Sequence, residues 1–333
     1  MAVFPPLARI AAPVPSRRTR AGAGMTSLPA GGAGDAAMHI GIDLGGTKVE
    51  VALTGPRFDA PLLRAREPTE QSGVPALVAQ IARLVARARA AAGEAPVTLG
   101  VGLPGSIDPE RDRVRNCGLP WLDGAPLPAL LRAATGLVPV LINDGHAFAL
   151  SEALLGAGRG HRLVLGLTLG TGAGGGVVID GALWPGRHGI GGEWGHMCIE
   201  AGGRPCYCGR RGCVEQYLSG TALERRYREL GGPVLRLPAI VARAGEDTVA
   251  AQVLAEAAGW FGLAVGSLVN LLDPDVIVLG GGLSQLDVLF GEGRAAMARQ
   301  AMTETLQTLL LPPRLGDSSG VLGAALIGAT VGA

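Results

Sequence analysis

Hydrophobic runs alternate along the chain with glycine turns and amphipathic segments, a pattern typical of a mixed α/β protein. Residues 75–92 carry apolar side chains at helical spacing and predict an amphipathic helix. The longest apolar run, residues 257–272, is short for a bilayer span and contains Ser267 and Asn270, so it predicts a buried helix. Shorter apolar runs predict buried strands at 97–103, 138–142 and 276–279.

Two segments share a pattern of strand, glycine turn and strand at an offset of 125 residues. Residues 40–47 read Ile-Gly-Ile-Asp-Leu-Gly-Gly-Thr, and residues 165–172 read Leu-Gly-Leu-Thr-Leu-Gly-Thr-Gly. The repeat predicts two like half-structures whose glycine hairpins face each other across a cleft. Chance similarity between glycine-rich strands is the alternative.

The first glycine turn has the composition of a phosphate-binding site. Gly45 and Gly46 allow backbone N–H groups to approach a phosphate, and Thr47 and Lys48 add a hydroxyl and a positive charge. The spacing matches neither a P-loop nor a dinucleotide-binding motif, and an ordinary hairpin turn is the alternative. Because Asp43 has no acidic counterpart in the second copy, we expect it to handle Mg²⁺ directly or through water.

Asn143 and Asp144 follow a predicted strand at the point where a helix begins. Asn143 is a typical N-cap residue. A carboxylate in the first turn is held ionised by the helix dipole, which suits a group that accepts a proton. Asp144 is therefore a candidate general base, and a helix cap without a chemical role is the alternative.

Three of the five cysteines lie close together, at Cys206, Cys208 and Cys213, and His196 precedes them. This spacing indicates metal ligation in a reducing compartment rather than a disulfide framework. Three thiolates and one imidazole are the donors of a closed, structural zinc site, and three unliganded thiols are the alternative.

Composition limits the classes of protein to consider. A chain of 333 residues with 48% hydrophobic and 17% charged residues can form two well-buried domains around a cleft. The net charge of +1 implies neither nucleic acid nor an anionic membrane as a partner. Residues 1–37 are rich in Pro, Ala, Gly and Ser and predict a disordered extension, or a mis-assigned start with Met25 or Met38 as the first residue.

The motifs together resemble those of the ROK (repressor, open reading frame, kinase) sugar kinases over residues 38–332. Asp-Leu-Gly-Gly-Thr-Lys, Asn-Asp, Leu-Gly-Thr-Gly, Gly-Glu-Trp-Gly-His, Cys-x-Cys-Gly-x-x-Gly-Cys-x-Glu and Gly-Gly-Gly occur in that family's order. The resemblance implies an α/β, actin-like ATPase fold, in which two ribonuclease-H-like domains surround a central cleft. We expect one domain at 38–142, rejoined by 318–333, and a larger one at 143–317 with a zinc-binding loop at 196–213.

The resemblance also implies ATP-dependent phosphorylation of a free hexose, with Mg²⁺ and with Asp144 as general base. Gly145 and His146 depart from the Ala-Asn that commonly follows the Asn-Asp motif. The implied sugar-binding residues are Gly105, Ser106, Asn116, Asn143, Glu193, His196 and Glu215. The implied nucleotide-binding residues are Asp43, Gly45, Gly46, Thr47, Lys48, Gly170, Thr171, Gly172, Gly280, Gly281 and Gly282.

Motifs within the family indicate two different sugars. Pro-Gly-Ser-Ile, Asn116 and Trp-Leu-Asp-Gly are similar to bacterial fructokinases, whereas Gly-His-Met resembles N-acetylglucosamine kinases. We expect residues 116–124 to border the sugar and therefore favour fructose, with N-acetylglucosamine kinase or glucokinase as the alternative. A sugar-responsive repressor is disfavoured because residues 1–37 have no helical pattern for a helix-turn-helix. We expect a cytoplasmic homodimer.

Overall fold

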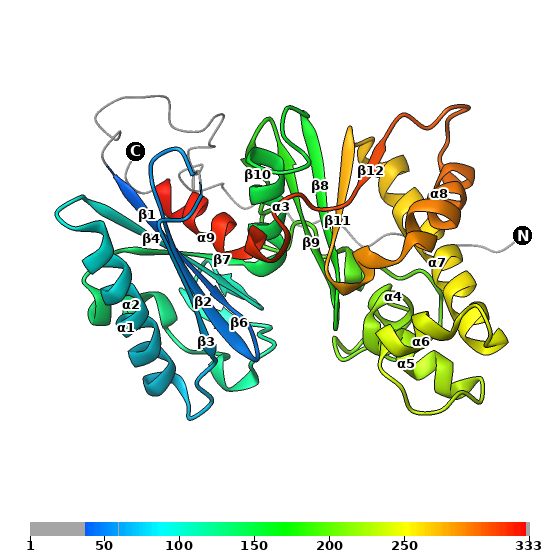
Figure 1. The fold of residues 1–333 in the computed structure, drawn as a ribbon, viewed down its shortest axis with the longest axis horizontal. Coiled ribbons are helices and arrows are strands. Elements are labelled where there is room, and N and C mark those ends of the chain that lie inside the picture. Colours follow the sequence, from blue (N-terminus) through cyan, green and yellow to red (C-terminus); the bar gives the residue numbers. More distant parts are fainter. Residues whose placement is uncertain (1–36, 59, 331–333) are drawn as a thin grey trace, which may run out of the picture.

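Two five-stranded sheets stand side by side, with two helices between them (Figure 1). The computed structural model describes residues 37–58 and 60–330. The predicted N-terminal extension therefore lies outside the described residues, apart from Ala37. The mixed α/β architecture agrees with the fold class expected from the sequence.

The two sheets repeat one topology. The first has the strand order β3-β2-β1-β4-β7 and the second β10-β9-β8-β11-β12. In the first sheet, β1 forms an antiparallel hairpin with β2 and pairs in parallel with β4. In the second sheet, β8 likewise forms an antiparallel hairpin with β9 and pairs in parallel with β11. The strands of the first sheet are β1 (Met38–Leu44), β2 (Lys48–Thr54), β3 (Leu63–Pro68), β4 (Val97–Leu103) and β7 (Pro139–Asn143). Those of the second are β8 (Leu163–Leu169), β9 (Ala173–Ile179), β10 (Ala182–Leu183), β11 (Val276–Gly280) and β12 (Leu309–Leu311).

The internal repeat seen in the sequence is confirmed by this arrangement. Each hairpin has two strands of seven residues, β1 with β2 and β8 with β9. Corresponding strands begin 125 residues apart, at Met38 and Leu163. The glycine turns 45–47 and 170–172 therefore occupy equivalent places in the two halves.

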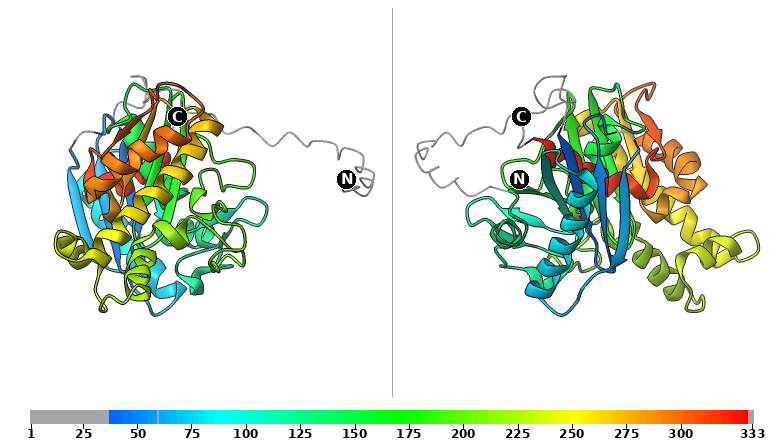
Figure 2. Two further views of the ribbon diagram at one scale, coloured as in Figure 1. Left: turned by 90° about the vertical axis from the view of Figure 1, so that its right-hand side faces the viewer. Right: turned by 60° about the vertical axis from the view of Figure 1, so that its left-hand side comes forward.

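Helices cover the outer faces of both sheets (Figure 2). On the first sheet, α1 buries Leu77, Ile81 and Leu84, as its helical spacing predicts. The helices of this half are α1 (Val74–Ala92) and α2 (Leu127–Thr135), and a small hairpin is formed by β5 (Ser106–Asp108) and β6 (Arg113–Arg115). The second sheet carries α4 (Glu215–Leu218), α5 (Gly220–Glu229), α6 (Leu237–Arg243), α7 (Thr248–Leu272) and α8 (Arg294–Gln300).

Helix α7 is the longest helix among the described residues and contains the long apolar run. By length and hydropathy alone it could span a membrane, a test that core helices of soluble proteins also pass. Its buried residues, which include Phe261 and Val265, pack into the larger hydrophobic core against the second sheet. The prediction of a buried helix is therefore confirmed.

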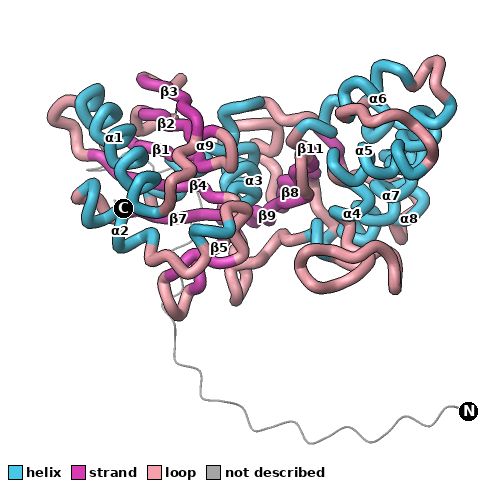
Figure 3. Tube along the Cα trace, turned by 90° about the horizontal axis from the view of Figure 1, so that it is seen from below, coloured by secondary structure: helices cyan, strands magenta, loops and turns pink. Residues whose placement is uncertain are grey.

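Helices α3 (Asp144–Leu154) and α9 (Ser319–Ala329) lie between the two sheets (Figures 1 and 3). Helix α9 comes from the end of the described chain but packs on β1 and β4 of the first sheet, backbone against backbone. A Cβ atom at Gly41 or Gly100 would overlap carbonyl groups of α9. The domain boundaries after residues 142 and 317 stay predictions.

This packing predicts that Gly100→Ala is strongly destabilising. The added Cβ would lie 2.7 Å from the carbonyl carbon of Ala324 and 2.9 Å from the nitrogen of Gly328, and neither backbone group can move freely. Overpacking of this kind costs about 3 kcal/mol of unfolding free energy, measurable by chemical denaturation. Gly55→Ala is the matched control, since no described atom lies within 4 Å of its added Cβ. Equal stability of the two variants would contradict the packing.

Candidate active site

The two glycine turns are open at their tips. At Gly46 and at Gly170 an added Cβ would meet no atom of the described residues within 4 Å. Each turn is closed at its base, because Gly45 N donates to Lys48 O and Gly170 N donates to Gly172 O, both at 2.9 Å. Open glycine turns with this backbone leave room for phosphate oxygens beside N–H groups.

Of the three glycines at 280–282, two are required by packing and one is open to a ligand. A Cβ at Gly280 would lie 2.5 Å from the ring of Phe148, and Gly281 has a φ of +80° and touches the backbone of Leu169. Both glycines are thus required by packing at the end of β11. At Gly282 no neighbouring atom within 4 Å is described, so this position is open to a ligand.

Asn143 fixes the first turn of α3, as the sequence predicts. Its side-chain oxygen accepts hydrogen bonds from the backbone nitrogens of Gly145 (2.9 Å) and His146 (3.2 Å). Its amide nitrogen donates to the carbonyl oxygen of Gly105 at 3.0 Å. The side chain therefore holds the loop after β4 against the helix, and one amide N–H is left for a ligand.

Asp144 follows this cap in the first turn of α3, close enough to Asp43 and Glu193 for their charges to act on it. Burial by the surrounding protein raises its pKa to about 6, and the charges of Asp43 and Glu193 act in the same direction. A hydrogen bond from Gly145 N opposes the shift. The side chain is itself open to solvent, and contact with water also works against the shift. At neutral pH the carboxylate is ionised and sufficiently basic to accept a proton.

Asp43 is a second carboxylate with a raised pKa. Burial and the neighbouring Glu50 raise it to about 6, against the opposing charges of Lys48 and Arg66. It lies between β4 and the start of α9. A Cβ at Gly102 would lie 3.7 Å from Asp43 Oδ1, and one at Gly320 would lie 2.6 Å from Oδ2. Two carboxylates of raised pKa in one cleft fit the donor chemistry of Mg²⁺, which prefers oxygen ligands.

Three further polar side chains gather near the second glycine turn. Glu215 Oε2 accepts a hydrogen bond from Ala173 N at 3.0 Å. Burial raises the pKa of Glu193, His196 lowers it and Glu215 raises it. Trp194 is buried between Glu193 and His196, and its indole N–H donates to Gly174 O at 2.6 Å. This bond holds the 193–196 segment on β9.

The remaining sugar-binding candidates lie at the end of β4 and on the β5–β6 hairpin. Ser106 is buried, and Asn116 is exposed with a left-handed φ of 51°. Trp121, in the expected sugar-bordering loop, packs against the core of the first half. An arginine that the sequence analysis missed links the halves: Arg115 Nε donates to Ser106 Oγ at 3.2 Å, and its Nη2 donates to His188 O. A lone arginine in a hairpin carries no signal in the sequence.

The cysteine cluster has the geometry of a metal site. The ligand atoms of the four predicted residues all lie within 4.8 Å of one another. Cys208 Sγ lies 3.6 Å from Cys213 Sγ, and Cys206 Sγ lies 3.7 Å from His196 Nδ1. A tetrahedral ion with bonds of about 2.3 Å to sulfur would set ligand separations of about 3.8 Å. The donors and their spacing therefore suit Zn²⁺.

A second residue that the sequence analysis missed, Tyr207, lies beside this cluster. Tyr207 lies between two of the cysteines, and its hydroxyl is 3.0 Å from His196 Nε2. The two rings meet edge to face, with centroids 5.3 Å apart. The tyrosine is 79% exposed. Its place within the Cys-x-Cys motif was the available signal.

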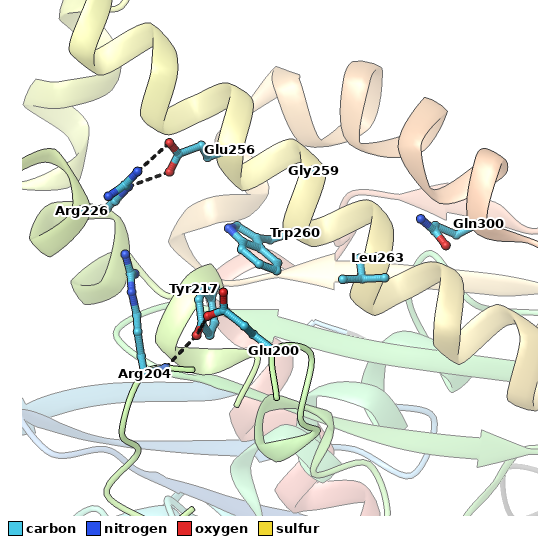
Figure 4. A pocket seen from close by; sticks show the side chains of 9 residues that line it. All are labelled: Glu200, Arg204, Tyr217, Arg226, Glu256, Gly259, Trp260, Leu263 and Gln300. Carbon is cyan, nitrogen blue, oxygen red and sulfur yellow. Dashed lines mark hydrogen bonds and ion pairs between the residues drawn. The ribbon is translucent and has the colours of Figure 1, made fainter. Parts of the chain in front are cut away.

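A polar hollow of about 670 Å³ lies beside the base of the cysteine loop (Figure 4). Tyr217 accepts a hydrogen bond from Arg204 N at 2.8 Å and donates to Glu200. Arg226 pairs with Glu256 at 2.7 and 2.9 Å. The bonds to Tyr217 fasten the loop to α4, and the pair of Arg226 with Glu256 joins α5 to α7.

Sugar kinases are among the known proteins to which the chain is similar. The chain is 36% identical over 309 residues to a glucokinase from Thermotoga maritima, covering 86% of this chain and 96% of that one. It is 35% identical over 314 residues to an N-acetyl-D-glucosamine kinase from Pectobacterium atrosepticum, covering 87% and 98%.

Among solved structures, a ROK family glucokinase from Streptomyces griseus, in complex with glucose and AMPPNP, superposes with a TM-score of 0.74. It is 31% identical to this chain, and the superposition covers 88% of this chain and 99% of the glucokinase chain. The sequence profile of the ROK family matches residues 39–330. With its two ribonuclease-H-like halves and its cleft, the chain belongs to the ROK family and is an ATP-dependent sugar kinase.

Proposed function

We propose that this sugar kinase transfers the γ-phosphoryl group of ATP to a hydroxyl of N-acetylglucosamine or glucose, with Asp144 as general base. The observation that carries the proposal is the place of Asp144. It lies at the first turn of α3, near Asp43 and Glu193, and its pKa is raised to about 6. A base of this pKa is ionised at neutral pH and can accept the hydroxyl proton as the phosphoryl group is transferred.

Phosphoryl transfer depends on positioning and charge neutralisation more than on covalent chemistry. The open turns at Gly46 and Gly170 would present N–H groups to the phosphates, and Lys48 would add a positive charge. Mg²⁺ would be held near Asp43 and, when bound, neutralises phosphate charge. Glu193 and Glu215 would orient the sugar hydroxyls, and His196, whose two ring nitrogens face Tyr207 and Cys206, would border the sugar.

The choice of sugar rests on the relatives. A glucokinase and an N-acetyl-D-glucosamine kinase are 36% and 35% identical to this chain, and the matches cover 86% and 87% of it. These names support the alternative drawn from the sequence, N-acetylglucosamine kinase or glucokinase, better than fructose. The preference for fructose rests on the 116–124 segment alone. The deciding experiment measures kcat/KM for ATP-dependent phosphorylation of N-acetylglucosamine, glucose, mannose and fructose. The highest value on either proposed sugar supports the assignment, whereas the highest value on fructose overturns it.

The assignment of the base predicts that Asp144→Asn lowers kcat by about 10²- to 10⁴-fold, the usual contribution of general base catalysis. Hexose affinity, measured by calorimetry, should persist because the amide keeps the shape of the side chain. Asp180→Asn is the matched control, since Asp180 lies on the surface and pairs with Arg162. Substantial turnover by Asp144→Asn would exclude Asp144 as the base.

The raised pKa predicts the pH dependence of the reaction. A base must be deprotonated to act, so kcat/KM should fall about tenfold per pH unit below a pKa of about 6. An unperturbed aspartate would lose activity only near pH 4. Initial rates at limiting hexose between pH 4.5 and 8 give this profile. A rate that stays constant down to pH 5 would contradict the raised pKa.

We also propose that the cysteine cluster holds one structural Zn²⁺. Cys208→Ala should then release the metal and weaken hexose binding, because His196 is both a ligand and a neighbour of Glu193. The matched control is Cys198→Ala, since Cys198 is exposed and outside the four ligands. Elemental analysis that finds no stoichiometric zinc in the wild-type protein would refute the site. The cytoplasmic location and the homodimer stay predictions.

A further inference from the structure

The Tyr207 side chain stands between the proposed zinc site and the proposed sugar site. Its hydroxyl is hydrogen-bonded to His196 Nε2 at 3.0 Å, while the other ring nitrogen, Nδ1, lies 3.7 Å from Cys206 Sγ within the cluster. Each nitrogen of the imidazole therefore has its own partner. A sugar hydroxyl that approaches this histidine meets the tyrosine as well.

The proposed metal fixes the direction of this hydrogen bond. An imidazole that binds a metal through Nδ1 carries its proton on Nε2 and donates from there. The tyrosine oxygen must then accept, which leaves the phenol O–H free to donate elsewhere. The tyrosine hydroxyl is thus a free donor beside His196.

The turn that carries Tyr207 is closed independently of any metal. Cys206 N donates to Arg210 O at 2.8 Å, and Gly209 N donates to Cys206 O at 3.0 Å. Gly212 N donates to Arg204 O at 2.8 Å, and Arg204 belongs to the network at the base of the loop. These bonds hold the tip of the loop on its own base, and the bond from Val214 N to Met197 O at 2.9 Å ties that base to the segment that carries His196.

The exposure of Tyr207 has no explanation in the stability of the fold. A ring that is 79% exposed contributes little hydrophobic stabilisation, and its hydroxyl would be equally well solvated by water. Aromatic rings with a polar tip are, in contrast, well suited to bind ligands that have both apolar faces and hydroxyls. A hexose has this character.

We propose that Tyr207 is a specificity-determining residue of the sugar site, whose hydroxyl donates to the acceptor hexose and whose ring borders the sugar beside His196. The inference rests on the proposed function, since it assigns a further contact to the same site. It extends that function by making the proposed zinc loop a wall of the sugar site, through the residue between two metal ligands.

The test compares Tyr207→Phe with the wild-type protein. Loss of one neutral hydrogen bond, worth about 0.5–1.5 kcal/mol, should raise the KM for the preferred hexose about 2- to 12-fold. The kcat, the KM for ATP and the zinc content should stay within twofold, because neither the base nor the metal ligands change. Tyr207→Ala, which also removes the ring, should raise the hexose KM further and alter the ranking of hexoses.

The matched control is Tyr227→Phe, which removes a hydroxyl that binds Asp247 at the start of α7. This variant should keep the wild-type hexose KM. A hexose KM within twofold of wild type in Tyr207→Phe, with zinc retained, would overturn the proposal. If Tyr207→Ala loses its zinc, the hexose KM of Tyr207→Phe alone decides between the two outcomes.

Calorimetric titration with hexose in the absence of ATP tests the Tyr207–hexose contact separately from the proposed kinase function. A wild-type protein that binds a hexose but does not phosphorylate it would refute the proposed function, while weaker binding by Tyr207→Phe would still support the contact. Full kinase activity with unchanged hexose binding in Tyr207→Phe would refute the contact alone.

Discussion

The first turn of α3 touches the backbone of β9, and the placement of the catalytic groups depends on this contact. A Cβ at Gly145 would lie 2.6 Å from Gly175 N, and one at Gly176 would lie 3.0 Å from the Cα of His146. The helix that follows the last strand of the first sheet is thereby held against the second sheet. Asp144 lies where the two halves meet.

This contact requires a glycine at the position after Asp144, where the family resemblance leads one to expect alanine. The close approach of β9 leaves no space for a Cβ atom at Gly145. His146 is buried, and its Nε2 bonds to Gly191 O just ahead of the Glu193–His196 segment. The departure therefore joins the base-carrying helix to the segment with the other proposed sugar ligands.

The features that were predictable from the sequence are those set by local spacing. The glycine hairpins, the Asn143 cap and the four metal-site residues each depend on neighbours within one short segment or on a visible repeat. Arg115 was missed because its contact with His188 depends on where distant segments meet, whereas Tyr207 had a signal in its place between two predicted metal ligands. Likewise, Gly280 and Gly281 matched a nucleotide motif, although packing against Phe148 and Leu169 already requires them.

Phosphoryl transfer with Asp144 as the base requires that an acceptor hydroxyl reach Asp144 while ATP lies between the glycine turns. A crystal structure with a non-hydrolysable ATP analogue and N-acetylglucosamine or glucose measures this directly. We predict one hexose hydroxyl within about 2.6–3.2 Å of an Asp144 carboxylate oxygen and in line with the γ-phosphate. A bound hexose with no hydroxyl within hydrogen-bonding distance of Asp144 would contradict the account.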